Sequence, residues 1–200
     1  MGVRLLAHTQ ASSDTLDERL ERLGCKFTTR WQIRCAFLRP NPAATQAAGI
    51  ADMFMFQASE QPQVYYILSQ GVLLVAGLEI SSVIDEMGTH AKRLRVTVDG
   101  SAHECGDFMV RVGKLQLNQQ VQGTVVEVEY KPCSLAKAEM SVLREFLGLL
   151  LPETQAEGSR DFISSANCFD LAQDLPAEFS LQHSVCQFVS LIRAKIIGGR

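Results

Sequence analysis

The chain has 200 residues, of which 46% are hydrophobic and 20% are charged, and its formal net charge is −3. This composition is typical of a globular protein with a substantial core, and it provides no basic surface for direct binding of nucleic acid. No apolar run approaches the ~20 residues of a membrane-spanning helix, and the start of the chain lacks a signal-peptide pattern. We therefore expect a non-secreted protein without a membrane segment, whose partners are other proteins.

Alternating apolar and polar residues, the signal of a half-buried strand, are frequent in the first half of the chain. They predict strands at residues 3–8, 31–37 and 53–57, and the short apolar runs at 64–69 and 72–76 are expected to be strands as well. Gln70-Gly71 is a candidate tight turn between the last two, because glycine readily takes a positive φ. A helix is expected over 14–23, where acidic residues begin the helix, basic residues follow and Gly24 ends it. Residues 39–49 contain two prolines and are expected to form a loop.

The middle of the chain predicts one short helix and three more strands. Ile80, Val83, Ile84 and Met87 lie at helical spacing before Gly88, and residues 93–99 return to alternation, with Gly100 expected to turn the chain. A hairpin follows from GDFMVRVG and TVVEVEYKPC, with its turn at 118–123. The total is about eight strands, enough to close into an antiparallel barrel, so the expected fold class is α+β with flanking helices.

An apolar helix is expected over 134–151, with Ser134 as its N-cap. One stripe, which includes Leu143 and Leu147, faces the protein, and Val142, Phe146 and Leu149 form a second stripe beside it. Two readings stay open at this point. The helix fills the centre of its own domain, or it lies between its own sheet and a partner protein.

The last quarter of the chain is expected to be mostly irregular. Residues 152–182 are rich in Pro, Ser, Gly, Asn and acidic residues, and a final helix with Val185, Phe188, Val189 and Ile192 on one face runs to Gly198-Gly199. Residues 1–200 are therefore expected to form a single β-barrel domain with inserted and C-terminal helices.

Cysteine and histidine residues give no sign of a metal or catalytic site. The six cysteines form no CxxC pair, and buried reduced thiols are the expectation. His103 and Cys105 alone cannot provide the four ligands of a structural zinc site, and no nucleophile, base and orienting group occur together in the sequence. We expect no catalytic residue, no metal and no cofactor.

The order of segments between Cys105 and Leu151 resembles the Mediator subunit 20 family, a head-module component of the RNA polymerase II coactivator. The resemblance lies in Cys105, Asp107-Phe108, MVRVG, VEVEYKPC and Leu143-Arg-Glu-Phe-Leu147. The start of the chain, the 14–23 helix and the YYILSQGVLLVAG hairpin resemble the family more loosely. Gly106, which separates Cys105 from Asp107, departs from the family pattern and leaves loop lengths open.

The resemblance implies a non-catalytic, nuclear coregulator of transcription. It implies a β-barrel that pairs with the related barrel of subunit 18, is connected to the head module through subunit 8, and acts on the RNA polymerase II machinery. Whether TATA-binding protein is among the direct contacts stays open.

Surplus apolar surface suggests where a partner binds. The runs VYYIL and VLLVA have almost no polar alternation, so an antiparallel barrel would expose some of their side chains on its outer face. The candidate interface residues are Tyr65, Tyr66, Val142, Phe146 and Leu149, and Tyr66 is preferred over Tyr65.

One motif favours an enzyme instead. Glu127, Glu129 and Lys131 form ExExK on one face of a strand, which resembles tunnel-type triphosphatases and adenylate-cyclase-like enzymes, in which glutamates inside a barrel hold a divalent metal. Arg93, Arg95, Arg111 and Lys114 would then contact a polyphosphate. The opposite face, with Val126 and Val128, is the better core set, so we expect the glutamates to face solvent or a partner.

Overall fold

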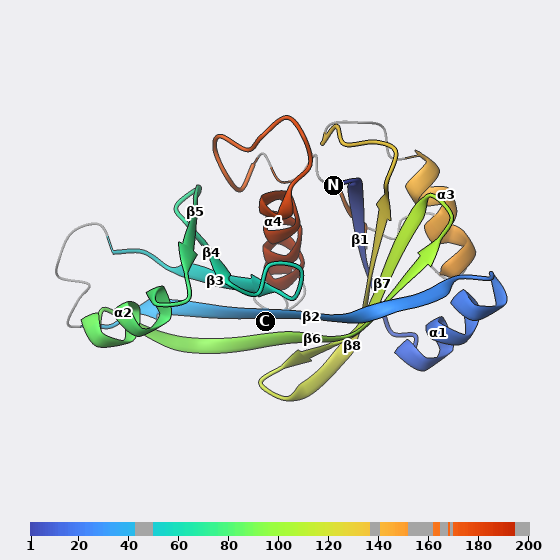
Figure 1. Ribbon diagram of the computed structural model, residues 1–200. Helices are drawn as coiled ribbons and strands as arrows, with labels where there is room; N and C mark the ends of the chain where they lie inside the picture. Colours follow the sequence, from blue (N-terminus) through green and yellow to red (C-terminus); the bar gives the residue numbers. More distant parts are fainter. Residues whose placement is uncertain (43–49, 137–140, 152–161, 165–167, 169, 195–200) are drawn as a thin grey trace.

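The computed structural model describes residues 1–42, 50–136, 141–151, 162–164, 168 and 170–194. The described strands form one antiparallel sheet in the order β5-β4-β3-β2-β6-β7-β8-β1-β9. The strands are β1 (Val3–Thr9), β2 (Lys26–Pro40), β3 (Met53–Ala58), β4 (Val64–Ser69), β5 (Val72–Gly77), β6 (His90–Cys105), β7 (Phe108–Leu117), β8 (Gln120–Tyr130) and β9 (Phe162–Ser164). The sheet curves strongly around one helix (Figure 1).

The four described helices cover both faces of this sheet. They are α1 (Ser13–Arg22), α2 (Ile80–Met87), α3 (Ser141–Leu150) and α4 (Leu181–Ile192). The helix α4 lies inside the curve, between the β3–β5 arm and β1, whereas α1 and α3 lie outside it at the opposite end from α2 (Figure 1). The expected fold class, an antiparallel barrel-like sheet with flanking helices, is confirmed. The short strand β9 falls in the segment expected to be irregular.

The two central strands are much longer than their sequence pattern suggested. The prediction that Gly100 turns the chain is wrong, because β6 continues through Gly100 and pairs with β2 over nearly its whole length. A Cβ atom at Gly100 would lie 1.8 Å from the carbonyl oxygen of Val112 on β7. Glycine is therefore needed here because a neighbouring strand passes close by, and not because the chain reverses.

Both expected hairpins are present, and the turn expected over 118–123 is only two residues long. Gln70 and Gly71 join β4 to β5 with φ values of 49° and 79°, and Asn118 and Gln119 join β7 to β8 with φ values of 47° and 74°. Two consecutive positive φ values are the mark of a type I′ turn, whose twist matches that of the flanking strands.

The helices α1 and α2 also agree with their sequence signals. Ser12 caps α1 by accepting the N–H of Thr15, and Gly24, just beyond the helix, has a φ of 77°. Gly88 ends α2 in the left-handed conformation.

The expected 134–151 helix is only partly correct. Ser134 is not an N-cap, because Leu135 forms an isolated antiparallel bridge with Glu178 and the carbonyl of Ser134 accepts the N–H of Phe179. The helix α3 is described from Ser141, and residues 137–140 lie outside the described residues. The same holds for 43–49, most of 152–169 and 195–200, so the predicted end of the last helix is not described.

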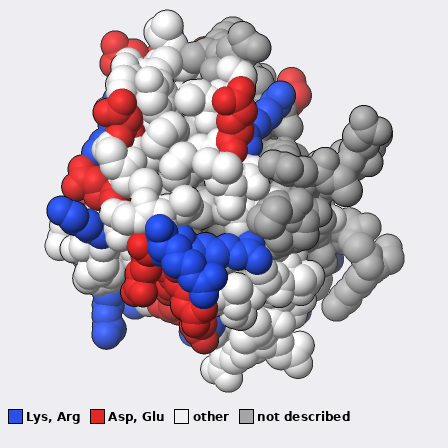
Figure 2. Space-filling model, turned by 90° about the vertical axis from the view of Figure 1, so that its right-hand side faces the viewer, with Lys and Arg blue, Asp and Glu red and all other residues white. Residues whose placement is uncertain are grey.

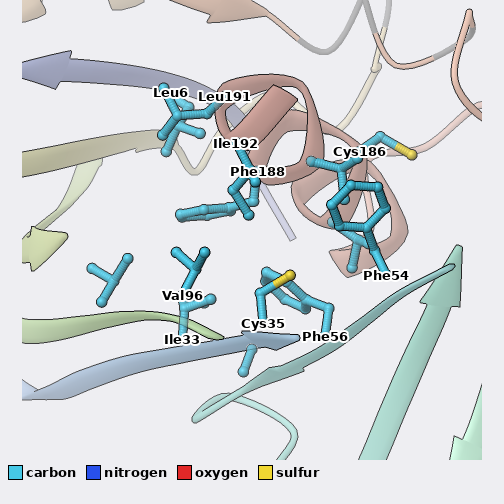
Figure 3. Close-up of a cluster of buried hydrophobic side chains, with 14 of the residues drawn as sticks. Leu6, Ile33, Cys35, Phe54, Phe56, Val96, Cys186, Phe188, Leu191 and Ile192 are labelled. Atoms are coloured by element: carbon cyan, nitrogen blue, oxygen red, sulfur yellow. The ribbon is translucent and has the colours of Figure 1, made fainter. Parts of the chain in front are cut away.

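Three apolar clusters hold the sheet and the helices together. The largest fills the inside of the curve, where Phe188 of α4 lies 5.6 Å from Phe56 and 6.1 Å from Trp31 between ring centroids (Figure 3). The second lies outside β1, β7 and β8, under α1 and α3, and the third lies outside β2, β3 and β4, under α2. Four cysteines, Cys25, Cys35, Cys168 and Cys186, are buried, and Cys105 and Cys133 are half-buried.

Candidate functional site

A cluster of charged side chains lies on the inner face of β7, β8 and β1. Strand pairing places Arg4 opposite Glu129 and Arg111 opposite Glu127, so all four side chains project from the same face of three adjacent strands. Guanidinium nitrogens of Arg4 and Arg111 lie 3.0 and 2.9 Å from Oε1 of Glu127. They also lie 3.2 and 2.8 Å from Oε2 of Glu129. These four side chains are almost completely buried.

A fifth member of the cluster comes from a distant turn. Glu60, between β3 and β4, lies 2.7 Å from Arg4 and 3.0 Å from Arg111 through its Oε1 atom. Glu60 thereby links the arm that contains β3 to β5 with the opposite end of the sheet. The sequence offers no signal for this contact, because Glu60 lies in an ordinary polar turn.

The surroundings of the cluster set the pKa values of its members. Burial raises the pKa of Glu129, but the nearby Arg4 and Arg111 guanidiniums outweigh it and hold that pKa below its ordinary value. Burial also raises the pKa of Glu127, and for this most deeply enclosed carboxyl it prevails over the same two cations. Two guanidiniums and three carboxylates make the formal charge of the cluster −1 when all are ionised, so one carboxyl is expected to resist ionisation.

The expectation that Glu127 and Glu129 face solvent or a partner is therefore wrong. Apolar alternation correctly placed Val126 and Val128 in a core, but α4 covers the other face as well. Ser184 of α4 lies 3.4 Å from Arg4 and accepts a hydrogen bond from its guanidinium. Both faces of β8 are buried, and the polar one is stabilised by ion pairs.

The geometry also separates the groups that a tunnel enzyme would need to bring together. Arg111 is held by glutamates, Lys114 lies 3.5 Å from Asp14 of α1, and Arg93 and Arg95 are exposed on the outer face of β6. The side chain of Lys131 pairs with Glu104 at 2.5 Å. Among the described residues, no group of three or more His, Cys, Asp or Glu side chains is arranged to hold a metal ion.

The five predicted interface residues fall into two regions. Tyr65 is half-buried on the outer face of β4, beside α2. Tyr66, the preferred of the two tyrosines, is 5% exposed, belongs to the inner core and donates its hydroxyl hydrogen bond to Gln61.

The other three residues lie on α3. Leu149 is 66% exposed and Val142 is 39% exposed, whereas Phe146 stacks on Phe108 of β7 with ring centroids 4.3 Å apart. Figure 2 looks onto the end of the molecule that carries α1 and α3, where charged side chains form separate groups with neutral surface between them. The second stripe of α3 is thus partly open to solvent.

More exposed apolar side chains lie on β5 and α2 than on α3. Val72, Leu74 and Val75 of β5 are each more than half exposed, and Val83 and Met87 of α2 are also exposed. The strand β5 ends the sheet, and within the described residues only β4 pairs with it. The apolar run in VLLVA was the signal for this surface, although nothing in the local sequence favours β5 over β4.

None of the helices that the structure describes is long and apolar enough to cross a membrane.

Comparison with known proteins gives a consistent result. Residues 1–193 match the family model of the TATA-binding related factor (TRF) of subunit 20 of Mediator complex. Mediator of RNA polymerase II transcription subunit 20 from Aedes aegypti is 28% identical over 161 residues, which cover 74% of this chain and 72% of that protein.

Two solved structures resemble the fold at low similarity. A chain of the Schizosaccharomyces pombe Mediator head module has a TM-score of 0.41 and 10% identity, with 76% of this chain and 94% of that chain covered. A candidate adenylate cyclase from Vibrio parahaemolyticus has a TM-score of 0.43 and 12% identity, with 89% and 92% covered. Both scores are below 0.5, so neither assigns a function. The match of the family model over residues 1–193 shows that this chain belongs to the Mediator subunit 20 family.

Proposed function

We propose that this chain is a non-catalytic subunit of the Mediator head module that regulates transcription in the nucleus by binding protein partners. Its principal partner is subunit 18, through which it is connected to subunit 8 and to the RNA polymerase II machinery, with TATA-binding protein as a further possible contact. Family membership supports the Mediator role. The exposed apolar edge at β5 is the single observation that carries the proposal of an obligate partner.

Leaving the edge strand β5 uncovered is unfavourable. An edge strand with free backbone groups and apolar side chains is a template for pairing with another chain. Val72, Leu74 and Val75 are 52%, 57% and 51% exposed, and Val83 and Met87 of the following helix α2 are exposed as well. A partner barrel that covers this surface would bury on the order of 2,000 Å² in an obligate interface. The second stripe of α3 is a smaller candidate surface.

Coexpression with subunit 18 tests the proposal. The isolated chain should aggregate, whereas the coexpressed pair should elute as a one-to-one complex in size-exclusion chromatography. Leu74→Asp should abolish the complex, because a buried unpaired carboxylate in an interface costs several kcal/mol.

Val121→Asp is the matched control. Val121 is also an exposed apolar strand residue, at 62%, but it lies near the turn of the β7–β8 hairpin. The control should retain the complex. A stable, monodisperse monomer that ignores subunit 18 would contradict the pairing, and loss of the complex in both variants would contradict the assignment to β5.

A further inference from the structure

A groove on the outer face of the sheet lies beside α2, and none of its lining residues belongs to β5. Its volume is about 520 Å³, which is within the range of sites that hold small ligands or peptide side chains. Ala36 of β2, Met55 of β3 and Tyr65 of β4 line its apolar part. Ser81 in the first turn of α2 lies at one side.

Four cations surround this groove. Arg34 of β2 and Lys92, Arg93 and Arg95 of β6 line it, and all four are exposed. Lys92 pairs with Asp85 of α2 at 2.9 Å. No carboxylate of the described part of the chain is paired with any of the three arginines. A chain with a net charge of −3 thus gathers three uncompensated guanidinium groups at one cavity.

The position of these arginines is fixed by the sheet. Arg34 pairs with Thr97 and Ala36 pairs with Arg95, so Arg34 and Arg95 are diagonal neighbours on adjacent strands. Asn118 holds the backbone of Arg95 on both sides, because its Oδ1 accepts the N–H of Arg95 at 2.9 Å and its own N–H donates to the Arg95 carbonyl at 2.8 Å. Diagonal neighbours with long side chains are within reach of each other, so one anion between the two guanidiniums can contact both.

We propose that this groove binds an acidic polypeptide segment in which an apolar side chain lies between carboxylate groups. The guanidiniums of Arg34 and Arg95 form bidentate hydrogen bonds with the carboxylates, since the planar arrangement of their donors matches a carboxylate. The apolar side chain of the segment lies on Met55 and Tyr65. The proposal does not depend on which partner covers β5.

The chemistry of the groove favours a polypeptide over a nucleic acid. A nucleic-acid site normally has a wide basic surface, with several aromatic side chains where single strands stack. Here one aromatic residue, Tyr65, lines a groove with an apolar floor, in a chain with an acidic net charge.

Fluorescence anisotropy with the full chain tests this inference. The probe is a labelled peptide in which Phe and Leu alternate with Asp and Glu, and the reference peptide has Asn and Gln in place of the acids. The acidic peptide should bind more tightly, and its affinity should fall as NaCl is raised, because salt screens charge pairs at the surface. The variant Arg34→Glu with Arg95→Glu should weaken binding by about tenfold or more.

Arg30→Glu is the matched control. Arg30 is an exposed arginine on the same strand, outside the groove, so this charge reversal should change the affinity by less than about twofold. Equal binding of both peptides, no effect of salt on the native chain, or equal losses in the Arg30 and Arg34/Arg95 variants would each overturn the proposal. Tighter binding of a single-stranded oligonucleotide than of the acidic peptide would overturn it too, in favour of a nucleic-acid site.

Discussion

The two faces of the sheet at β7, β8 and β1 are both buried, yet they are built from opposite kinds of residue. The outer face carries Val110, Val126 and Val128 and packs under α1 and α3. The inner face carries Arg4, Arg111, Glu127 and Glu129 and lies beside α4. The comparison shows that polar alternation along a strand does not by itself identify a solvated face, since a helix from the far end of the chain can cover it.

The outer face contributes mainly to stability, whereas the inner face determines which parts of the chain contact one another. Apolar burial on the outer face stabilises the fold in proportion to area and tolerates changes of shape. Ion pairs on the inner face contribute less net stability than their short distances suggest, because both partners lose their hydration. They do fix which groups meet: Glu60, Arg4 and Ser184 come from three distant parts of the chain.

The largest expected loss of stability comes from removing one charge from the cluster on the inner face. Arg4→Met should lower the free energy of unfolding by about 4 kcal/mol, because it leaves two buried glutamates with one guanidinium between them. Urea denaturation measures this. The double variant Arg4→Met with Glu127→Leu removes one charge of each sign and should cost less than the sum of the single changes. A loss below about 1 kcal/mol for Arg4→Met would show that the cluster is solvated in solution.

A cavity on the outer face should cost somewhat less. Leu147→Ala on α3 should destabilise the protein by about 3 kcal/mol, because Leu147 is completely buried in the apolar cluster outside the sheet. Thermal unfolding should show this loss. A loss of less than about 1 kcal/mol would mean that α3 does not pack on this face.

The helix that covers the inner face should make stability depend on pH. Burial lowers the pKa of His183, which forms a capping box with Ser180 at the start of α4. As the pH falls below about 6.5, the unfolded chain takes up a proton first, so this contribution to stability is present above that pH and is lost below it.

His183→Gln keeps a residue suited to the capping box but removes the titration. Its stability should fall less steeply between about pH 7 and pH 5 than that of the native chain. Identical pH profiles would show that protonation of His183 does not change the folding stability in this range.

The smallest effect is expected at the exposed stripe of α3. Leu149→Ser should change stability by less than about 0.5 kcal/mol, because Leu149 is 66% exposed. If the change weakens binding of a Mediator partner while stability is unaffected, α3 takes part in an interface. A large loss of stability would instead place Leu149 in the core.

Much of the fold could be predicted from the sequence where the signals are local. Ser12, Gly24 and Gly88 mark helix ends through their own conformations, and Gln70-Gly71 specifies a hairpin without reference to the rest of the chain. The role of Gly100 was misinterpreted, because glycine is required there by the close approach of Val112 on the neighbouring strand β7.

The candidate sites were less predictable because they depend on long-range contacts. The burial of Glu127 requires Arg4 and Ser184, which lie far away in the sequence. The lack of polar alternation indicated exposed apolar residues in both VYYIL and VLLVA. The structure exposes such residues only in VLLVA, because β5 is the edge of the sheet, whereas Tyr66 and most of VYYIL are buried. The cations of the outer groove lie on strands whose pairing no local pattern specifies.

The pairing of β1 has a consequence for how the chain reaches its native state. Both neighbours of β1 are synthesised much later, and Arg4 is separated from Glu127 by 123 residues along the chain. During translation, the strand that contains Leu5 and Leu6 therefore leaves the ribosome with no partner available. Pairings at such separation raise the contact order and slow folding, so the nascent N-terminal strand should need protection from aggregation until β8 has emerged.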